Sequence, residues 1–128
     1  MILENEKIKQ ALEYIKEEDQ ATTQDTLNMR QIPVHSYKDE KKEAYIRERL
    51  RELGSRDVRI DAVGNVTGIW PATGEGPRGM LAAHTDTVFP EGTDLTIRKE
   101  GNRYYCPGIN DDTHAVAEMI AVAKAMIH

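Results

Sequence analysis

The sequence predicts an α/β fold, because the spacing of its apolar residues changes along the chain. Before Gly54, apolar residues recur every three or four positions, which is typical of amphipathic helices. After Gly54 they alternate or form short runs bounded by glycine and proline, which is typical of strands. Residues 80–83 show little alternation, as expected of a strand buried on both faces. With 128 residues, the chain suits one domain or a piece of a larger one.

The N-terminal half is expected to form three successive helices. Their predicted bounds are residues 4–16, 19–32 and 39–53. Asp25 or Thr26 is available to cap the second helix, and Ser36 or Asp39 the third, because short polar side chains accept hydrogen bonds from free backbone N–H groups. Gly54 stands where the left-handed residue that follows a helix belongs.

The C-terminal half is expected to consist of strands and turns, followed by one helix. The predicted strands are residues 58–60, 66–70, 80–83, 95–98 and 103–106. The first two and the last two are close enough in sequence to form hairpins. An apolar stripe predicts a final helix over residues 112–127, which places Asp111 and Asp112 at its N-terminus.

Composition and charge exclude several classes of function. The net charge is −5 and no basic block stands out, so we expect no nucleic-acid partner. No apolar run approaches the ~20 residues that span a membrane, and the acidic N-terminus is unlike a signal peptide. Cys106 is the single cysteine, so no internal disulfide can form. These features predict a soluble cytoplasmic protein with no membrane partner.

Two polar motifs carry the candidate chemistry. His84-Thr85-Asp86 follows the apolar run, and Asp111-Asp112 precedes the last helix. Strand ends and helix starts are where α/β proteins gather reactive groups. An imidazole with carboxylates predicts a divalent-metal site, in which His84 and Asp111 are ligands and Asp86 supports the imidazole. Taken singly, each motif also has an ordinary interpretation, as a polar turn or as a helix cap.

Together with their surroundings, these motifs resemble the M20 family of metallopeptidases and amidohydrolases. Residues 81–88 are similar to the first metal motif of that family, and residues 107–112 to its second. Residues 32–34, 50–54 and 61–66 match its N-terminal pattern in the same order. The resemblance covers most of the chain. It implies that residues 1–128 are the N-terminal segment of a zinc-peptidase-like, three-layer α/β/α catalytic domain, which is incomplete without further elements.

The resemblance also implies roles for the motif residues. His84 would bind one of two zinc ions, Asp111 would bridge the two, and Asp86 would be the catalytic-site carboxylate that holds the His84 imidazole. The Asp111–Asp112 peptide bond would be cis. Cobalt or manganese could replace zinc, because all three tolerate imidazole and carboxylate ligands. Thr113-His114 replaces the Lys-Gly that is common in the family, a departure that concerns the substrate class. We expect His114 to face solvent or the helix start rather than the metal.

The implied reaction is hydrolysis of a peptide or N-acyl amide bond. In the family, a metal-bound bridging water is deprotonated by a glutamate and attacks the carbonyl carbon. That glutamate belongs to a Glu-Glu pair located farther from the bridging aspartate than this sequence extends. Glu118, within the last helix, is a poor substitute. We therefore expect this chain to be inactive alone.

Two classes of function remain open from the sequence. The first is a metallohydrolase fragment whose complete enzyme acts on a peptide or an N-acyl amino acid. The second is a non-catalytic chain that uses the half-fold for binding or assembly. In both cases, too few elements follow residues 80–83 to cover the predicted strand, so we expect a homo-oligomer.

Overall fold

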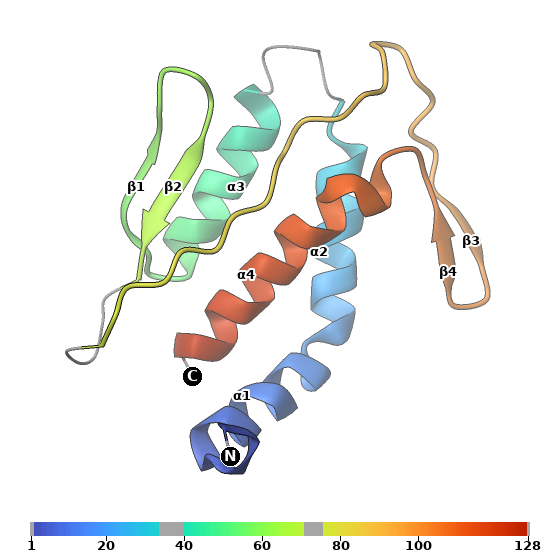
Figure 1. Cartoon of the computed structure of the whole chain (residues 1–128). Helices are drawn as coiled ribbons and strands as arrows, with labels where there is room; N and C mark the ends of the chain where they lie inside the picture. The colour runs from blue at the N-terminus through green and yellow to red at the C-terminus, as the bar shows by residue number, and fades with distance from the viewer. Residues whose placement is uncertain (1, 34–39, 71–75, 128) are drawn as a thin grey trace.

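The computed structural model describes residues 2–33, 40–70 and 76–127, and these form a mixed α/β fold in which helix predominates (Figure 1). The helices are α1 (Glu6–Glu17), α2 (Asp19–Gln31), α3 (Glu40–Glu52) and α4 (His114–Ile127), with short helical turns η1 (Ile2–Glu4) and η2 (Ile109–Thr113). The strands are β1 (Arg56–Ile60), β2 (Val66–Ile69), β3 (Arg98–Glu100) and β4 (Arg103–Tyr105). Within these residues, no helix is both long and apolar enough to cross a membrane.

The predicted helices are confirmed, and their ends differ from the predicted bounds by at most two residues. Asn5 caps α1, and its side-chain oxygen accepts a hydrogen bond from the Lys7 N–H at 3.0 Å. The predicted cap of the second helix is wrong: α2 begins at Asp19, so Asp25 and Thr26 lie inside it and are buried. Their polar side chains are used in contacts between helices instead. The predicted caps Ser36 and Asp39 lie outside the described residues.

Both predicted hairpins are present, as two separate antiparallel sheets. In the first, β1 pairs with β2 and packs on α3, with Ile60 opposite Val66. The second is shorter than predicted, because β3 begins at Arg98 rather than at Leu95. A two-residue turn joins β3 to β4, and Gly101 adopts a φ of 57° there, which a glycine tolerates without strain.

The predicted strand at residues 80–83 is wrong. Figure 1 shows this part of the chain as an extended trace past α3 and α4, without a paired strand beside it. Met80 and Leu81 are 89% and 59% exposed rather than buried. From Ala83 to Phe89, half-buried and exposed residues alternate, so one face lies on the helices and the other is open. A strand requires a paired backbone, and among the described residues no neighbouring strand supplies it.

The hydrophobic core lies between α2, α3, α4 and the first hairpin. Its buried side chains are Met29, Ile46, Leu50, Val116, Ala117 and Ile120. Burial of each large aliphatic side chain stabilises the fold by about 1.5–3 kcal/mol. Ala83 packs against this core from the extended segment, which therefore follows a defined path over the helices although it is not a strand.

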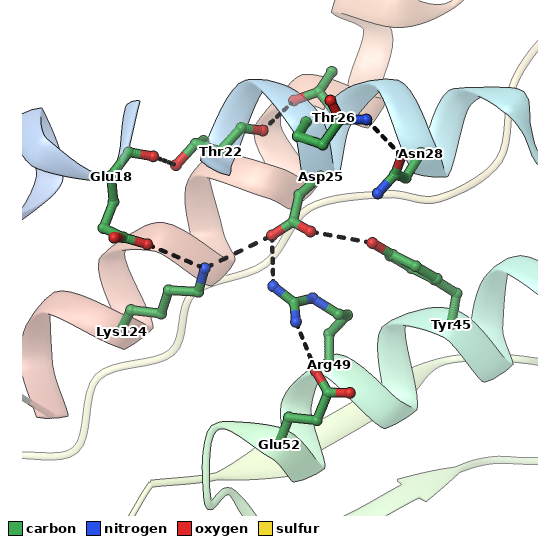
Figure 2. Close-up of polar contacts among 10 residues, drawn as sticks. Glu18, Thr22, Asp25, Thr26, Asn28, Tyr45, Arg49, Glu52 and Lys124 are labelled. Atoms are coloured by element: carbon green, nitrogen blue, oxygen red, sulfur yellow. Dashed lines mark hydrogen bonds and ion pairs between the residues drawn. The ribbon is translucent and has the colours of Figure 1, made fainter. Parts of the chain in front are cut away.

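A second set of contacts between the same helices is polar and centred on Asp25 of α2 (Figure 2). Its carboxylate accepts hydrogen bonds from Arg49 Nη2 at 2.8 Å and from Tyr45 Oη at 3.1 Å, both on α3. Lys124 Nζ of α4 lies 3.8 Å from the same carboxylate. Burial raises the pKa of Tyr45, and the nearby Asp25 charge adds to this effect. One carboxylate thus joins three helices.

Candidate metal centre

His84 lies in the extended segment, and the paired aspartates lie in η2, immediately before α4. The imidazole is placed between two carboxylates: Nδ1 is 3.1 Å from Asp86 Oδ1, and Nε2 is 3.1 Å from Asp111 Oδ1. His84 and Asp111 are 27 residues apart in sequence. The structure therefore brings together the three residues that the sequence analysis singled out.

Asp112 takes part in the same site in a different way. Its carboxylate Oδ2 accepts a hydrogen bond from the backbone N–H of His84 at 3.1 Å, and the same oxygen is 3.9 Å from His84 Nε2. Its side chain is only 22% exposed, whereas that of Asp111 is 80% exposed. Asp112 thus anchors the backbone at His84, while Asp111 faces the ring. The Asp111–Asp112 peptide bond is cis, as the resemblance implied.

Lys42 of α3 is a further site residue, and the sequence analysis did not identify it. It is 1% exposed, and its Nζ donates a hydrogen bond to the Thr85 carbonyl oxygen at 2.6 Å. The same Nζ lies 3.4 Å from Thr113 Oγ1, in the last residue of η2 just before α4. Lys42 therefore fixes the His84 segment against α3 and α4. The burial of Lys42 could have been predicted from the sequence. Lys42 precedes Ile46 and Leu50 by about one and two helical turns, so it shares their buried face of the helix.

The electrostatics of the site favour a positive charge beside the carboxylates. Partial burial has the largest single effect on the pKa of His84 and lowers it. Three carboxylates raise this pKa: Asp112 through its charge, Asp86 through a hydrogen bond and its charge, and Asp111 through a hydrogen bond. Together they outweigh the effect of burial, so the pKa of His84 lies above the ordinary value of 6.5. A divalent cation at His84 Nε2 would meet the same negative groups.

The donor atoms fit part of a zinc site. Two ligand atoms that each lie about 2.0–2.2 Å from one tetrahedral zinc ion are separated by roughly 3.3–3.6 Å. His84 Nε2 and Asp111 Oδ1 are 3.1 Å apart, so both can bind one ion with little movement. Among the described residues, no group of three or more His, Cys, Asp or Glu side chains could hold a metal ion. A complete site therefore needs ligands beyond this pair.

The other candidate residues make separate contacts. His114 Nε2 is 3.1 Å from Glu118 Oε1 within α4, and its Nδ1 is 3.3 Å from Thr26 Oγ1. Cys106 is half-buried, and its thiol donates to the Leu95 carbonyl oxygen at 3.4 Å. The two remaining histidines, His35 and His128, lie outside the described residues.

No protein-family model and no curated protein matches this chain.

Replacing Asp86 by Asn is expected to lower the pKa of His84, because one negative hydrogen-bond partner of the imidazole becomes neutral. NMR titration of the His84 ring signals measures this directly. In the wild-type protein, a raised folded pKa means that protonated His84 stabilises the fold below pH ~6.5, and that this contribution is lost as the pH rises through the folded pKa. Asp94→Asn, in another exposed loop, is the control. A His84 pKa that is identical in Asp86→Asn and wild type would contradict this account.

Proposed function

We propose that this chain supplies part of the active site of a metal-dependent hydrolase that cleaves peptide or N-acyl amide bonds. More particularly, residues 81–88 and 107–112 point to the M20 family, in which the chain would be the N-terminal part of a three-layer α/β/α catalytic domain. The observation that carries the proposal is the His84 imidazole, which has one carboxylate at 3.1 Å from each ring nitrogen.

The arrangement suits a metal ligand because each group has a separate task. The Asp86 carboxylate on Nδ1 favours the tautomer that carries its proton there, and this leaves the Nε2 lone pair free to bind a cation. The carboxylate of Asp111 adds a negatively charged oxygen on the Nε2 side, which can bind the same cation. Zinc, when bound, supplies Lewis acidity toward a carbonyl oxygen or a water molecule. The side chains of His84 and Asp111 are 52% and 80% exposed, so a substrate can reach them.

One observation favours the second candidate, a non-catalytic binding or assembly module. Met80, Leu81 and Val88 are 89%, 59% and 89% exposed, and they lie on both sides of the His84 motif. Exposed apolar side chains along an unpaired extended segment are typical of surfaces that associate with a partner or with a second copy. This candidate requires no metal chemistry.

Zinc titration by calorimetry tests the proposed function. We expect weak binding, in the micromolar range or weaker, because His84 and Asp111 are only part of a ligand set. The titration belongs above the raised pKa of His84, where the imidazole is neutral and can bind metal. His84→Ala should abolish the signal. His114→Ala is the matched control and should retain it, since the contacts of His114 are with Glu118 and Thr26.

The possible outcomes distinguish the two candidates. Equal zinc binding by wild type and His84→Ala would remove the proposed metal site. Nanomolar affinity that depends on His84 would overturn the expectation that the site is partial. Light scattering on the same samples completes the test, because a chain that self-associates and binds no zinc is the assembly module.

A further inference from the structure

Helix α1 has an apolar face that the rest of the described structure covers only in part. Ala11 and Ile15 are half-buried, on a helix that packs against α2 and α4. None of the 12 residues of α1, all of which the structure describes, is fully buried. Ile8 and Leu12, one helical turn apart, are 37% and 46% exposed. One side of the apolar face therefore remains open to a partner.

The elements that contact α1 carry further exposed apolar side chains. Ile2 and Leu3 of η1 are 75% and 59% exposed, and η1 packs against α1. Met126 and Ile127 are 75% and 50% exposed in the last turn of α4, whose C-terminal end lies near α1 in Figure 1. Large exposed apolar side chains on α1 and on two elements that contact it are typical of an interaction surface.

The charged residues beside this face alternate in sign. In chain order they are Glu6, Lys9, Glu13 and Lys16. Their spacing of three and four residues places them along one side of the helix, next to Leu12. Glu6 pairs with Lys9 at 2.7 Å and Glu13 with Lys16 at 3.0 Å. All four side chains are 52–77% exposed, so each can also reach a group on another molecule.

This order of charges fits a second copy of the same helix. In two antiparallel copies of α1 related by a two-fold axis at residue 11, Glu6 of one copy lies at the level of Lys16 of the other. Lys9 likewise lies at the level of Glu13. The two-fold axis brings the same side of each helix together, so opposite charges meet. In parallel copies in register, like charges would face each other.

The same register interleaves the apolar side chains. Along the helix pair, the order is Ile8 of the first copy, Leu12 of the second, Leu12 of the first and Ile8 of the second. The helical rise of about 1.5 Å per residue makes each step about 3 Å. Side chains that alternate in this way pack into the spaces between one another. One register therefore satisfies both the charges and the apolar face.

We propose that α1 pairs antiparallel with α1 of a second copy, so that the chain forms a weak homodimer. The contact is small, because each copy contributes mainly one short helix, and small contacts are typical of weak complexes. The inference does not rest on the proposed hydrolase, because α1 lies at the opposite end of α4 from η2 in Figure 1.

Sedimentation equilibrium of the metal-free, full-length chain, from about 10 µM to about 1 mM, tests the proposal. We expect a monomer–dimer equilibrium in the wild type. Leu12→Glu should weaken it by roughly tenfold or more, because two added carboxylates would face each other at the axis. Gln10→Glu is the matched control, since it adds the same charge on the exposed polar face of α1. It should dimerise as wild type does.

Two double variants test the charge pairing. Glu6→Lys with Glu13→Lys makes the row entirely basic, and Lys9→Glu with Lys16→Glu makes it entirely acidic. Each alone should dimerise roughly tenfold more weakly or less, because like charges then face each other. An equimolar mixture should restore the dimer. The two variants shift the net charge in opposite directions, so a loss in both cannot come from the overall charge.

Three outcomes would overturn the proposal. The first is a monomer throughout the concentration range. The second is dimerisation of both double variants with the affinity of the wild type. The third is association that persists in Leu12→Glu but is lost in Leu81→Glu, which would assign the contact to the extended segment. The mutated side chains are exposed, and far-UV circular dichroism of each variant verifies that the helices are retained.

Discussion

Replacing Asp25 by Ala should lower the free energy of unfolding by about 3 kcal/mol, near the lower limit for breaking a buried ion pair. The side chain of Asp25 is 10% exposed and lies between two cations, Arg49 and Lys124, whose side chains are 24% and 12% exposed. Without the carboxylate, both cations remain partly buried with a partner missing, and Tyr45 Oη loses its acceptor. The cost arises mainly from these groups left behind, since the contacts themselves replace hydration.

Urea unfolding of the variant and of the wild type measures this difference. Glu13→Ala is the control, because it breaks the exposed Lys16–Glu13 pair of α1, whose side chains are 73% and 66% exposed. Such a surface pair should contribute less than about 0.5 kcal/mol. Asp25→Asn retains an acceptor for Tyr45, so its loss of unfolding free energy should lie between those of Asp25→Ala and Glu13→Ala. Equal effects of Asp25→Ala and Glu13→Ala would show that the network in Figure 2 does not stabilise the helix packing.

Replacing Lys42 by Met should weaken zinc binding by roughly tenfold or more, an effect comparable to that of residues that orient metal ligands. It should also lower the free energy of unfolding by about 1–3 kcal/mol, because the Thr85 carbonyl oxygen loses a charged donor at 2.6 Å. Methionine retains most of the apolar stem of the lysine side chain, so the packing around position 42 of α3 changes little. Lys42 touches neither proposed ligand directly, and it acts by holding the segment that carries His84.

Parallel calorimetry and urea unfolding of Lys42→Met and Lys41→Met check both parts of this prediction. Lys41 is the neighbouring residue on α3 and is exposed, so its variant should behave as wild type. Lys42 would have no part in positioning the site if Lys42→Met lost stability but retained full zinc affinity.

Local structure could be read from the sequence because its causes are local. Helix bounds followed from apolar spacing at three and four residues, and the hairpins followed from alternation around Gly64 and Gly101. The meeting of His84 with Asp111 was also predicted, through the resemblance of the two motifs. The helix and hairpin inferences required no element far away in the chain, whereas the meeting of His84 with Asp111, 27 residues apart, was inferred from the resemblance alone.

Contacts between distant segments could not be read in the same way. Asp25 looked like a helix cap, because its neighbours in sequence do not reveal that Arg49 and Lys124 surround it in the folded chain. Lys42 and Arg30 are charged, and charged residues are buried only where packing encloses them. That enclosure depends on α4 and on the loop after His84, which approach from later in the sequence.

By itself, the sequence determined where helices and hairpins form and which imidazole and carboxylates are candidates for binding metal. Tertiary structure alone decided that residues 80–82 lie extended and open, that Lys42 holds the His84 segment, and that Arg30 is buried beside a cavity. The physical reason is that periodicity is a property of neighbouring residues, whereas burial and pairing depend on which surfaces meet after the chain folds.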